Sequence, residues 1–185
     1  MRSFLLGLGL LLLAAEGGAA PAAKPANLLA NGSFEDGPEV KDFLSVDKDS
    51  TAIKGWKVTR GQIDIVASTY WPAFDGKRSI DLHGSPGFGG IAQTFKTKKG
   101  KKYRVTFQLA GTPGAGERSV VVEAAGEKKT FDTDPGNSTR EKLKWDKITW
   151  DFTAIGDETT LEIATTEKGD PNQGPIIDDV VVAEK

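Results

Sequence analysis

One stretch near the middle of the chain decides the fold: Tyr103-Arg104-Val105-Thr106-Phe107-Gln108-Leu109-Ala110. Tyrosine, valine, phenylalanine and leucine take every second position, and arginine, threonine and glutamine take the positions between them. Because successive side chains of a strand point to opposite faces of a sheet, this alternation predicts a β-strand with one face buried in a core.

Similar short runs recur on both sides of this strand, separated by clusters of Gly, Pro, Asn and Asp. The only helix we expect after the first twenty residues is one short turn within residues 39–52. Many short strands without helices predict an all-β fold, an antiparallel β-sandwich of the jelly-roll type. The remaining strands are expected at residues 56–58, 62–66, 79–83, 90–95, 119–124, 147–153, 159–165 and 176–182, with the lysine-rich segment 96–102 as a solvated turn.

The chain begins with a basic pair, an apolar run and a set of small residues. This layout is typical of a secretory signal peptide, which we place at residues 1–20 with cleavage between about residues 20 and 23. Residues 21–26 are expected to form a flexible leader, and residues 27–185 a single domain. We therefore expect a secreted protein without a membrane span, located outside the cell, on its surface or in a periplasm.

The charges of the chain are nearly balanced, with 24 Lys and Arg against 26 Asp and Glu. This balance argues against nucleic acid or an anionic membrane as a partner, since both favour clustered positive charge. The chain has no cysteine, so its stability must come from the core or from a bound metal. His83 is the only histidine, which excludes a site with two histidines.

Two short segments near the ends of the domain carry acidic residues beside apolar ones: Asn31-Gly32-Ser33-Phe34-Glu35 and Ile176-Ile177-Asp178-Asp179-Val180-Val181-Val182. Buried carboxylates need a compensating partner, because uncompensated buried charge is very costly. A glutamate from one end and an aspartate from the other suggest a shared cation. We therefore expect the two ends of the domain to lie side by side.

Together with several central segments, these ends resemble galactose-binding-like carbohydrate modules. The chain resembles the bacterial choice-of-anchor C family and the plant cell-wall "domain of unknown function six-four-two" family over residues 27–182. The resemblance implies a jelly-roll sandwich, export to the cell surface or wall, and polysaccharide binding without catalysis. The segments that carry it are residues 28–35, 55–58, 76–84, 91–95, 103–109, 152–154 and 177–180, with Trp145.

The resemblance also implies a structural calcium ion held by Glu35 and Asp178. Calcium takes six to eight oxygen ligands, so backbone carbonyls, with Ser33 as a candidate, would have to supply the rest. The alternative is that amide groups of a loop donate hydrogen bonds to both carboxylates. Asp179 is expected to point to the opposite face of its strand.

The candidate sugar site is the aromatic loop at residues 68–76, since aromatic rings stack on the apolar faces of sugars. Tyr70, Trp71 and Phe74 are its aromatic members, and Asp75 and Arg78 lie close by in sequence. The alternative is that one or two of these rings close the end of the sandwich. Further candidates are the polar strand face with Gln108, to which Asp81 and Gln93 would add, and a sugar-bonding role for His83, which is otherwise structural.

Three functions are compatible with this pattern. The first is a non-catalytic, monomeric protein that binds a polysaccharide or another glycan. The second is a structural or interaction module whose partners are other extracellular proteins. The third is a small glycoside hydrolase or lyase with paired carboxylates, against which the small single domain argues.

Overall fold

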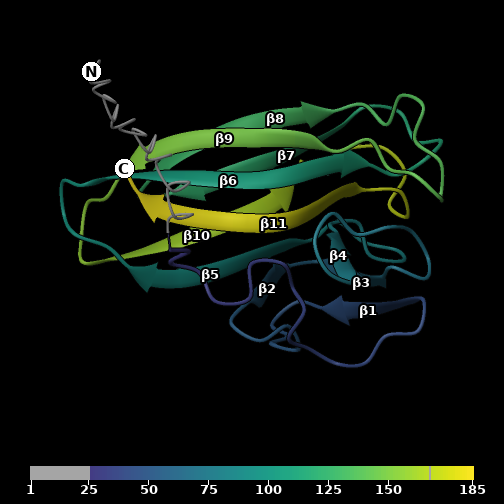
Figure 1. The fold of residues 1–185 in the computed structure, drawn as a ribbon, viewed down its shortest axis with the longest axis horizontal. Coiled ribbons are helices and arrows are strands. Elements are labelled where there is room, and N and C mark those ends of the chain that lie inside the picture. Colours follow the sequence, from purple (N-terminus) through teal and green to yellow (C-terminus); the bar gives the residue numbers. More distant parts are fainter. Residues whose placement is uncertain (1–25, 167) are drawn as a thin grey trace, which may run out of the picture.

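The computed structural model describes residues 26–166 and 168–185. Every regular element in these residues is a β-strand, and the strands form two antiparallel sheets packed face to face (Figure 1). The predicted all-β sandwich is thus confirmed. The expected signal peptide and nearly all of the leader lie outside the described residues. Within the described part of the chain, no helix is long and apolar enough to cross a membrane.

The first sheet has six strands in the order β1-β3-β4-β11-β6-β9, and the second has five in the order β2-β5-β10-β7-β8. Their bounds are β1 Phe43–Asp47, β2 Lys57–Arg60, β3 Gln62–Ala67, β4 Arg78–Asp81, β5 Gly90–Lys96, β6 Lys102–Gly111, β7 Arg118–Ala124, β8 Glu127–Thr133, β9 Asp146–Thr153, β10 Glu158–Thr165 and β11 Pro175–Glu184.

The core lies between the two sheets and is built from the apolar positions of the alternating strands. Phe107 on β6 and Ile163 on β10 are among the side chains with no more than 1% exposure. Burying a side chain of this size stabilises the fold by about 1.5–3 kcal/mol. The alternate positions of the six-stranded sheet point away from this core and form the sheet's outer face.

The first and last segments of the domain lie side by side, as the sequence predicts. Leu28 N–H donates to the Val182 carbonyl at 2.8 Å, and Val180 N–H donates to the Gly32 carbonyl at 2.9 Å. The Asn27 side chain bonds both Val180 and Val182. These bonds hold the N-terminal segment along β11.

Two strands differ from the sequence-based expectation. The helical turn expected within residues 39–52 is wrong, because β1 occupies Phe43–Asp47 and pairs with β3. β8 was not anticipated, since as the edge strand of its sheet it exposes five of its seven residues and shows no apolar alternation. A bulge between Asp178 and Val181 also breaks the alternation of β11, so Asp179, with φ 46°, does not follow the simple two-face pattern.

Candidate functional site

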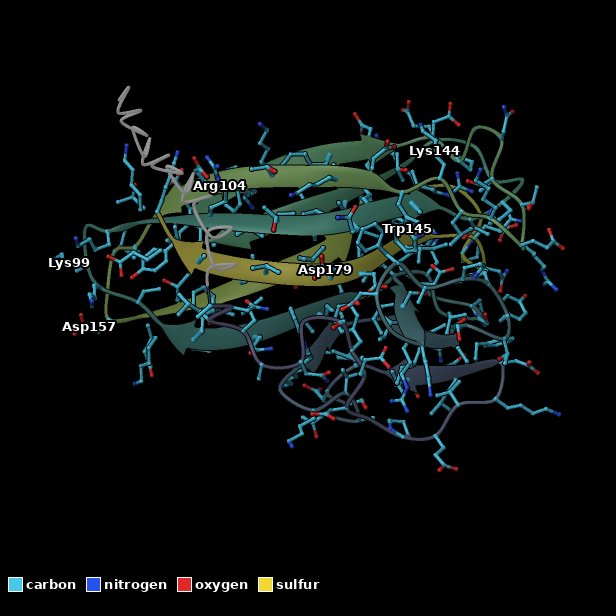
Figure 2. All side chains as sticks on the ribbon, in the orientation of Figure 1. Lys99, Arg104, Lys144, Trp145, Asp157 and Asp179 are labelled. Atoms are coloured by element: carbon cyan, nitrogen blue, oxygen red, sulfur yellow. The ribbon has the colours of Figure 1, made fainter. Side chains whose placement is uncertain are left out.

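The outer face of the six-stranded sheet carries a second apolar cluster beside the main core. The β3–β4 loop, residues 68–77, contributes Trp71 to this cluster, and Tyr70 packs against it. The segment before β9 contributes Leu143, with Trp145 packed alongside at the loop-rich end of the sandwich (Figure 2). The remaining members are Val66, Ala110 and Ile176, from β3, β6 and β11.

A cavity of about 180 Å³ opens on this face. Phe43, Tyr70 and Trp71 form its aromatic wall, and Asp64 and Asp81 are its acidic members. The other lining residues are Val66, Ser85, Thr112, Pro113, Arg140, Asn172 and Gln173. Six separate parts of the chain therefore converge on it, namely β1, the β3–β4 hairpin and the loops between β4 and β5, β6 and β7, β8 and β9, and β10 and β11.

The aromatic wall is held by ring contacts and one buried hydrogen bond. Tyr70 meets Trp71 edge-to-face at 5.0 Å between ring centroids and Phe43 at 5.5 Å. The Trp71 indole N–H donates to Ser79 Oγ at 3.0 Å, which fixes the orientation of the ring. Arg140 lies 4.1 Å above the Tyr70 ring and also donates to its hydroxyl. The wall is therefore preorganised.

The acidic pair comes from neighbouring strands. Asp64 on β3 and Asp81 on β4 are register partners, so their side chains share one face of the sheet. Ser45 and Ser85 hydroxyls each donate to Asp64 at 2.6 Å. Burial raises the pKa of the Asp64 carboxyl.

Asp81 is the more deeply buried of the two, with 2% exposure. It accepts the His83 backbone N–H at 2.8 Å and lies 3.3 Å from the Thr112 hydroxyl. Burial, with a smaller contribution from the neighbouring charge of Asp64, raises the pKa of Asp81 to about 8. The site thus offers a protonatable acid pair next to aromatic rings.

The carboxylates predicted to bind calcium both bond the aromatic loop. Glu35 Oε1 accepts the backbone N–H groups of Lys77 and Arg78 at 2.8 and 2.9 Å. Asp178 Oδ2 accepts those of Phe74 and Asp75 at 2.8 and 3.0 Å. Loop amides are therefore present at both carboxylates, as the alternative interpretation expects.

The same geometry bears on the calcium hypothesis. Glu35 and Asp178 together have four carboxylate oxygens, and three of them accept backbone N–H groups: Glu35 Oε1, Asp178 Oδ2 and Asp178 Oδ1. The last of these accepts the Asp179 N–H at 2.6 Å. Burial raises the pKa of Asp178 to about 7. No group of three or more acidic, histidine or cysteine side chains in the described residues is placed to hold a metal. The donor set is thus small for calcium, and the ion stays a prediction.

The predicted site residues fall into separate places. Tyr70 and Trp71 line the cavity. Phe74 lies outside it, 48% exposed and 6.1 Å from the Trp145 ring. Asp75 and Ser33 line another surface depression, beside Asp179.

Three further candidates are engaged elsewhere. His83 is fully buried, and its ring bonds the Asp170 carbonyl and the Thr165 hydroxyl, both at 2.8 Å. Gln108 is buried opposite Asp178 on the outer face of the six-stranded sheet. Gln93, which we expected near Gln108, lies instead on β5 of the other sheet and bonds Ala30.

Sequence reasoning missed Phe43, Asp64 and Arg140. Asp64 does carry a signal, since it is the one acidic residue within the apolar run Ile63-Asp64-Ile65-Val66. Arg140 reaches the cavity from a loop about 70 residues beyond Tyr70, and a single sequence does not show that contact.

Comparison with known proteins gives a matching family and solved structures that share this fold. A family model described as "Protein of unknown function (DUF642)" matches residues 27–183. The solved structure of TmCBM61 in complex with β-1,4-galactotriose is 18% identical, with a TM-score of 0.52, and covers 86% of this chain and 99% of its own. A family 16 carbohydrate-binding module is 17% identical, with a TM-score of 0.51, over 85% and 100%. These similarities show the fold.

Two relatives are similar to this chain in sequence. Halomucin of Haloquadratum walsbyi is 34% identical over 171 residues, which are 88% of this chain and 2% of Halomucin. The Arabidopsis thaliana protein DUF642 L-galactono-1,4-lactone-responsive gene 1 is 26% identical over 170 residues, which are 83% of this chain and 45% of the plant protein. The chain thus spans less than half the length of either relative.

Proposed function

This chain belongs to the DUF642 family, and from that premise we propose that it is a secreted, non-catalytic protein that binds a polysaccharide in the cavity on its six-stranded sheet. The observation that carries the proposal is the convergence of three aromatic rings and a set of hydroxyl-bonding groups in one cavity. Phe43, Tyr70 and Trp71 supply apolar faces for a sugar ring. Asp64 and Asp81 supply acceptors for its hydroxyl groups.

The fold supports the same reading. Two solved structures with this architecture are carbohydrate-binding modules by name, and one holds a β-1,4-linked galactose trimer. Fold alone does not establish function, which belongs to the site. The cavity provides the site that the fold leaves open, and an extracellular location follows from the expected signal peptide.

A second candidate function rests on the acid pair. Glycosidases use two carboxyl groups about 5–10 Å apart that flank the scissile bond. Asp64 and Asp81 lie side by side on one sheet. The hydroxyls of Ser45 and Ser85 each donate to one of the two Asp64 carboxylate oxygens. Two acids on the same side of a ligand are better placed to bind than to attack and protonate from opposite sides. Binding is therefore our first proposal.

The test is retention of the protein on a panel of insoluble polysaccharides, with the release of reducing ends measured in the same tubes. We expect retention without release. Release of reducing ends would establish the hydrolase alternative, and a protein that is neither retained nor active would favour the interaction module.

Two surface phenylalanines give a matched pair of variants for locating the site. Phe43 is 44% exposed and lines the cavity, whereas Phe74 is 48% exposed and lies outside it. We expect Phe43→Ala to weaken retention about fivefold, the equivalent of about 1 kcal/mol for an aromatic contact. Phe74→Ala should bind as the unmodified protein does. If Phe74→Ala weakens retention and Phe43→Ala does not, the site lies at the tip of the β3–β4 loop. If the site is the cavity, Trp71→Ala should abolish retention.

A further inference from the structure

The acid pair gives the cavity a one-sided charge. Asp64 and Asp81 are 5% and 2% exposed and face the cavity from directly opposite positions on β3 and β4. Side chains at such positions have Cβ atoms about 5 Å apart. The groups that bond them are neutral, namely the hydroxyls of Ser45, Ser85 and Thr112 and a backbone amide.

The one cationic residue in the lining, among the described residues, stands apart from this pair. Arg140 is exposed, stacks over the Tyr70 ring and donates to the Tyr70 hydroxyl. Its charge is therefore exposed to solvent, where it is strongly screened. Asp64 supplies the negative charge of the acid pair, because the pKa of Asp81 is raised to about 8 and Asp81 is protonated at pH 7. This charge lies in the sheet, where screening is weaker. A ligand seated against Asp64 and Asp81 meets negative charge.

The volume of the cavity limits the size of the ligand that can bind in it. At about 180 Å³ it is smaller than the roughly 300–1,000 Å³ of pockets for drug-sized ligands. One sugar residue of a polysaccharide fills such a space, so recognition depends on the substituents of that residue.

We propose that at neutral pH the cavity selects its ligand by charge, accepting a neutral sugar residue and rejecting a uronic acid, and that Asp64 is the residue that makes this choice. The inference rests on the proposed function. Sugar hydroxyls donate to carboxylate oxygens, and hydrogen bonds to a charged acceptor are the stronger kind. A uronate instead brings a second negative charge beside Asp64, which is 5% exposed, and like charges repel more strongly away from bulk water.

The experiment compares polysaccharides that differ only in charge. Polygalacturonate is paired with its methyl ester, and β-1,4-galactan with the same chain oxidised at C6 to carboxylate. Dissociation constants are measured by affinity electrophoresis for each member of a pair. We expect the neutral member to bind at least tenfold more tightly. Equal or tighter binding of the anionic member overturns the inference while leaving the proposed function intact, whereas no binding to either pair or to the panel overturns both.

Variants then locate the selectivity. At pH 7, Asp64→Asn should shrink the ratio between neutral and anionic members, whereas Asp81→Asn, which replaces a protonated acid, should change it much less. Circular dichroism identifies a variant that fails to fold. Asp157→Asn changes the net charge equally at the far end of the sandwich and should keep the ratio (Figure 2). An unchanged ratio in a folded Asp64→Asn variant refutes the role of Asp64. Arg140→Gln should leave the ratio unchanged. If this variant instead abolishes binding of the anionic polysaccharides, Arg140 at the rim of the cavity is the group that binds acidic sugars.

Discussion

The buried acid of the cavity predicts a specific dependence of stability on pH. The pKa of Asp81 is raised by burial from an ordinary value of 3.8 to about 8 in the folded protein. Between these two values the folded protein therefore binds more protons than the unfolded chain. Stability must fall as pH rises through this window, by about 1.4 kcal/mol per pH unit for one group. From pH 5 to pH 7 the loss is about 3 kcal/mol.

The assay is thermal unfolding of the protein and of Asp81→Asn at pH 5, 6 and 7. Asparagine cannot ionise, so the variant should gain about 3 kcal/mol relative to the unmodified protein between pH 5 and pH 7. For a domain of this size that is a relative shift in Tm of roughly 6–12 °C. His83, whose pKa is lowered by burial, and Asp178, whose pKa is raised to about 7, are present in both proteins, so their contributions cancel in the comparison.

A constant Tm difference between the two proteins across this range would refute the reasoning. It would mean that Asp81 is already ionised at pH 5 in the folded state.

Three other predictions address the fold and the predicted ion. Gly32→Ala should lower Tm, because an added Cβ would lie 2.0 Å from the Val180 carbonyl oxygen, whereas Gly156→Ala meets nothing closer than 3.8 Å and should change stability by less than about 0.5 kcal/mol. Equal Tm values would show that the N-terminal segment is not held against β11. Phe107→Ala should cost about 3–5 kcal/mol in chemical denaturation and Ile155→Ala, 67% exposed, almost nothing. A chelator should lower Tm by several degrees if calcium is bound, and superimposable curves with chelator and with calcium would remove the ion.

The strands that the sequence predicted are those whose two faces meet different surroundings. β6 alternates because its apolar positions fill the core while its polar positions lie on the outer face. β8 escaped prediction because an edge strand has little to bury on either side. β1 exposes Phe43 and Leu44 and buries no residue fully, so its pattern does not separate it from a loop.

The site was predicted only where the chemistry is local in sequence. Tyr70 and Trp71 are neighbours in one loop, and an aromatic cluster within a few residues is visible in the sequence. Asp64 and Asp81 meet only through the pairing of β3 with β4, a register that the sequence does not display. Arg140 depends on where a long loop returns, which is set by packing of the whole domain.

The two end motifs and the aromatic loop form one mechanical unit. Glu35 comes from the segment that lies along β11, and Asp178 comes from β11 itself. Each accepts two backbone N–H groups of residues 74–78, so the loop is fixed at both ends of this stretch by the chain's first and last segments. Trp71 lies three residues before the first of these bonds. The motifs at the chain ends therefore act on the cavity through hydrogen bonds to the loop backbone, and they keep this role whether or not a cation joins them.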